Sequence, residues 1–310
     1  KGWNIRVHHL TNGSEHGYPR LYKNFTDEAV KPILDLGGGS GTGALYLAEP
    51  GHDELLLTCD WTTGKIYNDK VSEKGASYSL KESVYMNLPR AIDIDVDGSG
   101  NLFVCDWRGG RFKFAGKGKK VGMVQKLTKN GLEGQPFPEL RGMSTSELVL
   151  QLKSSSAVRR LEVQRVLLAK AETGSIKPLT ILVKDSRLSI ESRIAAIFTL
   201  SQMKEMTADQ FLQIFAKDWK DLKEIQQYLT RAAGDLSGEI SSDTLSLVEG
   251  ALQSGDERTR LQAVVFLMRI GNPAKNATAQ ILKALTEAQD PRIQNTAVGA
   301  LVKIGDVESL

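Results

Sequence analysis

Residues 33–60 resemble a nucleotide-binding segment. The resemblance depends on the five glycines within residues 37–43 and on two acids, Asp35 and Asp60. The stretch ILDLGGGSGTGALYLAE places the glycines between two apolar runs, and the first run carries Asp35. The next apolar run ends at Asp60, about where an acid binds the ribose in a dinucleotide-binding unit. Such spacing would suit a dehydrogenase, or a methyltransferase that binds S-adenosylmethionine at the glycines and Asp60.

The elements around these residues do not fit that chemistry. A nucleotide-binding sheet alternates strands with crossover helices. Here the apolar run 44–49 stops at Pro50-Gly51, too early for a crossover helix, and residues 61–64 turn straight into another strand. We therefore predict a strand at 44–47 and a glycine loop that leads into it. A methyltransferase stays as a distant alternative.

A repeated tripeptide points to a different architecture. Cys-Asp-Trp occurs at Cys59–Trp61 and again at Cys105–Trp107, each time after an apolar strand and before a glycine-containing turn. Short strands that repeat with a period of about 40 to 50 residues are typical of β-propeller blades. We expect the two Asp side chains to accept turn amides, and the two Cys to be small buried apolar groups.

Between the two copies, residues 91–96 alternate as a half-buried strand. The pattern predicts Ile92, Ile94 and Val96 on one face, followed by a hairpin at Asp97. The acids at 93, 95 and 97 also match the start of a calcium-binding loop. Val104 stands where that loop needs a glutamate, and no helices flank it, so we predict a strand and a turn.

We predict no metal site in this chain. Two cysteines make neither a disulfide framework nor a metal cluster. His8 and His9 are adjacent, so on a strand they face opposite sides. We expect both to be packing or surface residues.

The second part of the chain is helical. Residues 131–143 carry prolines and glycines and are predicted as a linker, and Ser144 with Glu147 forms a capping box that begins a helix. Four later segments vary one theme, in which Asp or Ser leads into a basic residue and an aliphatic stripe; they occupy residues 156–170, 189–203, 256–271 and 290–305.

These segments resemble HEAT repeats. Aligned on Val163, Ala196, Ala263 and Ala297, they recur at about 34 residues or twice that, with a diverged copy near residues 225–234. Each has a preceding helix, so we expect five stacked pairs with one continuous core. Basic residues begin several of the helices, and we expect them to serve the repeat fold or a ligand-binding ridge: Arg159, Arg160, Arg193, Arg258 and Arg260.

Composition narrows the class of protein. With 41% hydrophobic and 25% charged residues, the chain should be globular. A net charge of +3 does not indicate a nucleic-acid partner, and no apolar run is long enough to span a membrane. The chain starts at Lys1, so we expect it to be a piece of a longer protein.

The order of these segments resembles a known architecture. Residues 34–43 and 60–67 are the most specific parts, and the HEAT-like repeats follow them. Together they are similar to planctomycete-type proteins that join a quinoprotein propeller, of the glucose/sorbosone dehydrogenase kind, to HEAT repeats and often to a cytochrome c domain. The resemblance implies a fold class of partial β-propeller followed by an α-solenoid. It implies propeller blades (the last two to three) at 1–130, the linker at 131–143 and HEAT-like repeats at 144–310.

The resemblance also implies a cofactor. In those dehydrogenases pyrroloquinoline quinone (PQQ) and Ca²⁺ lie on the propeller axis, and haem c belongs to the C-terminal domain. The matching cofactor-binding positions here are Arg90, Tyr18 and Thr62, with Tyr18 in the stretch GSEHGYP. Leu88 and Thr62 replace cationic family residues. The family's catalytic His belongs to earlier blades, so we expect no catalytic residue in this chain, and the chain itself requires no cofactor.

Two functions remain open at this stage. The first is the C-terminal part of a periplasmic or cell-surface dehydrogenase that oxidises a sugar or alcohol, with a cytochrome c acceptor or another protein bound through the repeats. The second is a non-catalytic propeller–HEAT scaffold that binds carbohydrate or protein. Arg90 and residues 13–19 favour the enzyme, whereas Leu88 and Thr62 favour the scaffold.

Overall fold

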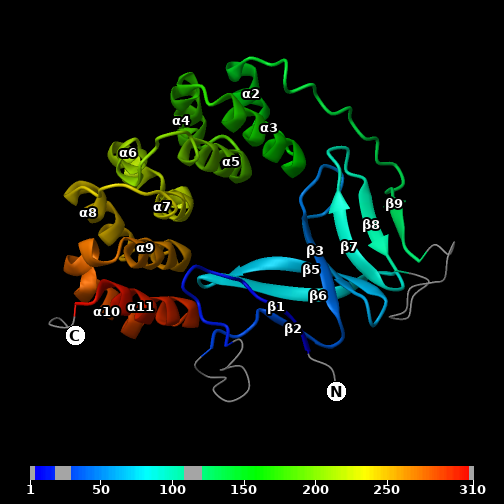
Figure 1. Cartoon of the computed structure of the whole chain (residues 1–310), viewed down its shortest axis with the longest axis horizontal. Helices are drawn as coiled ribbons and strands as arrows, with labels where there is room; N and C mark the ends of the chain where they lie inside the picture. Colours follow the sequence, from blue (N-terminus) through cyan, green and yellow to red (C-terminus); the bar gives the residue numbers. More distant parts are fainter. Residues whose placement is uncertain (1–3, 18–28, 108–120, 307–310) are drawn as a thin grey trace.

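The computed structural model of the chain describes residues 4–17, 29–107 and 121–306, and it shows a mixed β and α fold. Residues 4–127 form the strand half, and residues 145–306 form the helical half. Figure 1 shows the helices as an arc whose open side is spanned by the strands. No helix in the described residues is long and apolar enough to cross a membrane.

The strand half contains three antiparallel sheets. Each is a simple meander or pair, so neighbours in sequence are neighbours in the sheet. The first pairs β1 (Asn4–Val7) with β2 (Leu34–Gly38). The second has the order β3 (Gly41–Leu47), β4 (Leu55–Asp60), β5 (Lys65–Lys74), β6 (Ser77–Asn87), and the third has the order β7 (Ala91–Val96), β8 (Leu102–Asp106), β9 (Met123–Leu127).

The two faces of the four-stranded sheet have different neighbours. Leu57, Cys59 and Ile66 lie on one face and form a buried cluster with Ile94 and Val104 of the third sheet. Side chains alternate along a strand, so the residues between them point to the opposite face. That opposite face is turned toward the helical half.

The predicted alternation of residues 91–96 is partly wrong. A bulge interrupts the pairing of β7 with β8 between Ala91 and Asp93. Ala91 and Ile94 therefore reach the core, while Ile92 is 37% exposed. A bulge adds one residue to a strand and shifts the alternation beyond it, which explains why a strict period of two fails here.

The predicted glycine loop is also wrong, because most of these glycines lie within strands. Only residues 39–40 form the turn between β2 and β3. A Cβ atom on Gly39 would stand 2.6 Å from the Asp60 carboxylate, and one on Gly43 would stand 2.4 Å from that of Asp93. Gly39 and Gly43 are thus required where neighbouring segments approach closely, and no crossover helix follows the glycines.

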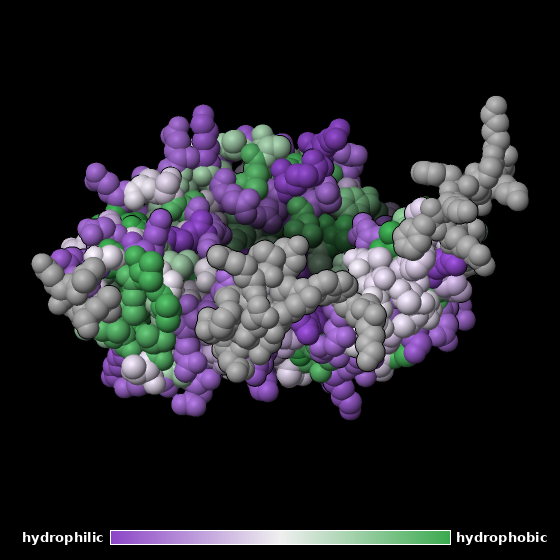
Figure 2. Space-filling view, turned by 60° about the horizontal axis from the view of Figure 1, so that its bottom comes forward, coloured by the Kyte–Doolittle hydropathy of each residue, from purple (hydrophilic) through white to green (hydrophobic). Residues whose placement is uncertain are grey.

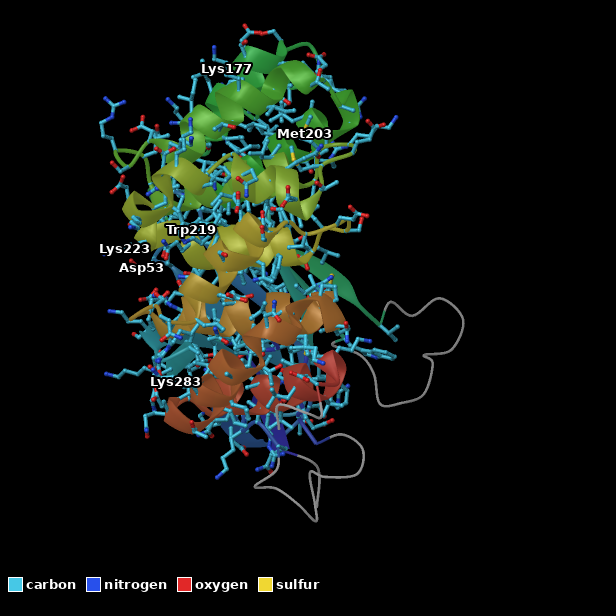
Figure 3. The ribbon with its side chains drawn as sticks, turned by 90° about the vertical axis from the view of Figure 1, so that its left-hand side faces the viewer. Asp53, Lys177, Met203, Trp219, Lys223 and Lys283 are labelled. Atoms are coloured by element: carbon cyan, nitrogen blue, oxygen red, sulfur yellow. The ribbon has the colours of Figure 1, made fainter. Side chains whose placement is uncertain are left out.

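The helical half consists of five successive helix pairs within the described residues. The pairs are α2 (Thr145–Gln151) with α3 (Ala157–Lys170), α4 (Ile176–Lys184) with α5 (Ile190–Ser201), α6 (Ala208–Gln213) with α7 (Gln226–Gly234), α8 (Ser242–Ala251) with α9 (Glu257–Ile270), and α10 (Thr278–Glu287) with α11 (Pro291–Ile304). The second helices, α3, α5, α7, α9 and α11, pack in one row. Figure 3 looks onto the side of the helical half where Lys177, Lys223 and Lys283 lie.

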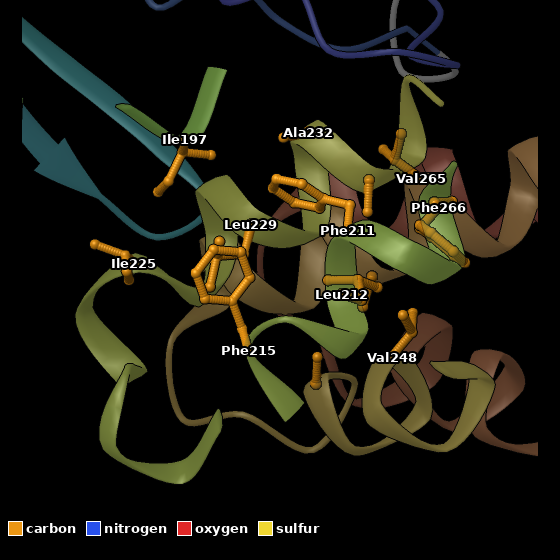
Figure 4. Packing of buried hydrophobic residues seen from close by; sticks show 14 of the residues in the cluster. Ile197, Phe211, Leu212, Phe215, Ile225, Leu229, Ala232, Val248, Val265 and Phe266 are labelled. Carbon is orange, nitrogen blue, oxygen red and sulfur yellow. The ribbon is translucent and has the colours of Figure 1, made fainter. Parts of the chain in front are cut away.

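Local sequence accounts for these helices. The capping box of Ser144 and Glu147 is present as predicted. Asp256 caps α9 and Asp290 caps α11, each by accepting from backbone amides of the first turn. Ala196, Ala263 and Ala297 are fully buried between neighbouring helices. Figure 4 shows the aromatic part of the core, in which Phe211 meets Phe215 edge-on with ring centroids 5.5 Å apart.

The two halves contact each other at both ends of the arc. Near α3, Ala48 O accepts from Ala157 N at 3.2 Å, and the buried Glu49 carboxylate accepts from Val158 N at 2.9 Å. Near α9 and α11, the tip of the β5–β6 hairpin places Ala76 in the helical core, and Ala76 N donates to Asp290 Oδ2 at 3.0 Å. The middle helices α5 and α7 therefore face the strands across a gap.

Candidate functional site

The gap between the halves contains a cavity of about 1190 Å³. Its walls are β1, β3, β4, the β5–β6 hairpin, and the first turns of α5 and α7. Figure 2 shows a recess between the helices and the strands, with apolar residues deep inside it. A concave site of this kind is where ligands usually bind.

Three tyrosines from three elements line this cavity: Tyr46 of β3, Tyr78 of β6 and Tyr228 of α7. His9 meets Tyr78 edge-on, with ring centroids 5.1 Å apart. Burial, with Tyr78 as the next cause, raises the pKa of Tyr228 to about 12. Burial, Glu54, Glu191 and Tyr78 raise the pKa of Tyr46. All three tyrosines thus border the same cavity.

Carboxylates supply most of the charge in the lining. Tyr46 donates to Glu54 at 3.3 Å, Glu191 lies in the first turn of α5, and Glu73 pairs with Arg258. Arg6 is the cation of the lining, and it pairs with Asp35 at 3.2 Å. Arg160 lies within electrostatic reach of Glu191 and Glu54, although it does not line the cavity, and it offsets part of their charge.

The histidines of the N-terminal segment are partly buried and contact one another and the β5–β6 hairpin. His9 Nδ1 lies 2.9 Å from Ser77 Oγ, and His8 Nδ1 lies 3.0 Å from His16 Nδ1. Burial lowers the pKa of all three imidazoles, and Arg292 lowers it further. Among the residues that the structure describes, no cluster of His, Cys, Asp and Glu could hold a metal ion.

The sheet face beneath the cavity carries two buried polar groups. Thr58 lines the cavity and is 8% exposed, and its hydroxyl has no hydrogen-bond partner among the described residues. Asp69 is fully buried, and neither carboxylate oxygen has such a partner. Burial, followed by the charge of Glu82, raises the pKa of Asp69 to about 6.

The sequence-predicted cofactor residues lie elsewhere. Arg90 has a positive φ of 58° and stacks its guanidinium on Trp61, 5.2 Å from the ring centroid. Thr62 follows that Trp and donates its hydroxyl to Ser40 Oγ at 2.8 Å. The structure thus brings Arg90 and Thr62 to one edge of the sheets, but neither lines the cavity. Tyr18 lies outside the described residues.

The two copies of the repeated tripeptide have different surroundings in the structure. Asp60 accepts from Ser40 N and Thr62 N at 3.0 and 2.9 Å, which confirms its predicted role with turn amides. Asp106 accepts from the Gln125 side chain of β9. Cys59 is buried, and burial raises its pKa to about 11. Cys105 is exposed, so the prediction that it is buried is wrong; no further sheet covers that face of β8 in the described residues.

The basic residues at the helix starts serve the fold. Arg159 donates to Gly98 O, Gln135 O and Pro136 O, and so fastens α3 to the strand half and the linker. Arg193 donates to Val183 O and pairs with Glu224 at 2.7 Å. Arg160, Arg258 and Arg260 likewise have carbonyl or carboxylate partners. These contacts support the structural role over a ligand-binding ridge.

No protein-family model and no curated protein sequence matches the chain. The site must therefore be interpreted from its own chemistry.

Proposed function

We propose that this chain is part of a non-catalytic propeller–HEAT scaffold that binds saccharide in the cavity between its halves. The packing of successive antiparallel meanders supports assignment of the strand half as blades of a propeller. The row of five helix pairs supports assignment of the helical half as HEAT-like repeats. A periplasmic or cell-surface location suits such a ligand.

The convergence of Tyr46, Tyr78 and Tyr228 carries this proposal. A tyrosine combines an apolar ring face, which packs on the C–H face of a sugar ring, with a hydroxyl that takes a hydrogen bond. Glu54 and Glu191 add acceptors for sugar hydroxyls. At about 1190 Å³ the cavity exceeds the usual size of a small-molecule site, so it has room for more than one sugar ring.

The electrostatics of the cavity disfavour a quinone cofactor there. PQQ carries carboxylates, which need cationic partners. The lining instead presents Glu54 and Glu191, while its other charges are already paired, Glu73 with Arg258 and Arg6 with Asp35. Carboxylates facing an anionic ligand raise its free energy in the site.

One observation favours a second candidate, the sugar or alcohol dehydrogenase. Arg90 is held over Trp61 beside Thr62, at the edge where the resemblance puts PQQ and Ca²⁺. In that case a complete propeller would bind the quinone and pass electrons to a cytochrome c, whose haem would belong to another domain. Arg90→Ala would then weaken the binding of PQQ.

Calorimetric titration with a panel of neutral and charged di- and trisaccharides tests the first proposal. We expect at least one saccharide to bind, and Tyr78→Ala to abolish the heat. Tyr85→Ala is the matched control, because Tyr85 lies on the same strand but does not line the cavity. Absence of saccharide binding, together with PQQ binding that Arg90→Ala weakens, would replace the scaffold by the dehydrogenase.

A further inference from the structure

The sheet face on the cavity side has two polar groups whose hydrogen-bonding capacity is unused, one in the cavity lining and one beside it on the same face. They are the hydroxyl of Thr58 and the carboxylate of Asp69, both more than nine-tenths buried. A buried polar group without a partner costs free energy, and an unpaired carboxylate costs more than a hydroxyl. A ligand that supplies the missing partners would recover that free energy.

The strand register places both groups on the cavity side of the sheet. Leu56 stands opposite Asp69, and residues opposite each other in an antiparallel pair point to the same face. Leu56, Thr58, Val71 and Leu80 all line the cavity. Asp69 is not itself a lining residue, but it lies on the same sheet face, two positions from Val71 on its own strand and diagonal to Thr58.

The second copy of the repeated tripeptide provides an internal comparison. Val104 occupies in β8 the position that Thr58 occupies in β4, one residue before the Cys. Val104 is fully buried against the four-stranded sheet, whereas Thr58 faces the cavity. The position is therefore polar where a cavity lies beneath it and apolar where a sheet covers it.

The charge around Asp69 indicates what kind of partner is missing. Its neighbour across the strands is Glu82, and no described cation pairs with Asp69. The lining adds further carboxylates and three tyrosine rings, and the face of an aromatic ring attracts a cation. A neutral hydroxyl would satisfy one hydrogen bond, but an ammonium group would satisfy both the hydrogen bond and the charge.

We infer that Asp69 and Thr58 form the anchor for a protonated amino group of a saccharide, so that the cavity prefers an amino sugar with a free amine. This inference rests on the proposed function and names the ligand class of the same site. The amine donates to the Asp69 carboxylate and to Thr58 Oγ, and the tyrosines pack on the sugar ring.

A matched pair of ligands tests it. The intact chain is titrated calorimetrically near neutral pH with a β-1,4-linked glucosamine disaccharide and with its fully N-acetylated form. The free amine should bind at least about tenfold more tightly. Asp69→Asn should remove that difference and leave the affinity for the acetylated form unchanged, whereas Asp95→Asn, an exposed strand carboxylate, should change neither.

Each other outcome is decisive. Equal affinities of the two disaccharides, or a preference that survives in Asp69→Asn, would overturn the amine anchor and leave the saccharide site standing. Absence of binding by both disaccharides and by the wider panel would overturn both proposals. Circular dichroism of each variant confirms that a lost preference is not a loss of folding.

Discussion

Two acids, one in each half of the molecule, differ in their hydrogen bonding. In the helical half, Asp256 accepts from Arg258 N, Thr259 N and the Thr259 hydroxyl, and so begins a helix. In the strand half, Asp69 is fully buried and has no donor in the described residues, whereas Asp256 is partly exposed. The helical acid stabilises the fold, whereas the strand acid costs stability.

The difference shows where ligand chemistry is concentrated. The helical half supplies a regular stack with a continuous apolar core, and it contributes only the first turns of α5 and α7 to the cavity. The strand half supplies Tyr46, Tyr78, Thr58 and the acids beneath. Sites that tolerate unsatisfied polar groups are commonly functional, since stability is given up there for binding.

The largest change in the free energy of unfolding should come from a substitution in the helical core. Phe266 is 1% exposed, and Phe266→Ala should lower the free energy of unfolding by about 3–5 kcal/mol through lost contacts and a cavity. Chemical denaturation measures this. Val302→Ala on the exposed side of α11 is the control, with a change of less than about 0.5 kcal/mol. Similar small losses of unfolding free energy in both variants would show that the helical core is not closely packed around Phe266.

Replacement of Asp69 should raise the free energy of unfolding, by less than Phe266→Ala lowers it. Its pKa of about 6 in the folded chain is above the ordinary 3.8, so the folded state disfavours the charged form. Asp69→Asn should therefore stabilise the chain by on the order of 2 kcal/mol above pH 6. The gain should shrink as pH falls through about 6 and vanish below about 4, where the acid is protonated in both the folded and unfolded states.

Denaturation curves of wild type and variant across this pH range measure the effect at Asp69. Asp95→Asn serves again as the control and should show no such pH dependence. A loss of stability in Asp69→Asn at neutral pH would mean that the carboxylate has a protein partner, and it would end the contrast between the halves.

The smallest change in stability should come from loss of a capping acid, and it should be similar in the two halves. Asp60 and Asp256 each accept from backbone amides and from a nearby threonine hydroxyl. Replacement of either by Ala should cost about 1 kcal/mol, the usual value of a capping side chain. Thermal unfolding compares the two variants directly. A much larger loss for Asp60→Ala would show that Asp60 holds the first two sheets together as well as capping a turn.

The helical half could be predicted closely from the sequence because its signals are local. Each of three helices begins one residue after a capping side chain that the sequence shows, namely Ser144 (with Glu147), Asp256 and Asp290. Buried alanines at a repeat spacing predicted the close row of helices. The caps depend on residues a few positions apart, and the alanines recur once per helix pair, so both signals can be found along the sequence without knowledge of the tertiary contacts.

The strand half was predicted less well because its exceptions depend on neighbouring sheets. The bulge after Ala91 exposes Ile92, and the alternating sequence gives no sign of it. Cys105 is exposed although its repeat partner Cys59 is buried, because only the latter faces another sheet. The glycines of residues 37–43 look like a loop until the close approach of Asp60 to Gly39 and of Asp93 to Gly43 is known.

The cavity could not be predicted at all. Its existence depends on contacts between residues far apart in the chain, such as Ala76 with Asp290 and Glu49 with Val158. The turn at Gly75 looks like an ordinary hairpin, and Tyr46, Tyr78 and Tyr228 lie in unrelated segments. The one available signal was the polar Asp69 within a strand, and alone it would suggest a solvent-facing position.

Amide hydrogen exchange in the presence and absence of the best-binding saccharide tests the central claim most directly. The account predicts slower exchange in β3, in the β5–β6 hairpin and in the first turns of α5 and α7, and no change in the outer helices α4 and α10. Tyr78→Ala should erase the protection. Protection confined to the outer helices, or to the edge around Arg90 and Trp61, would contradict a saccharide site between the two halves.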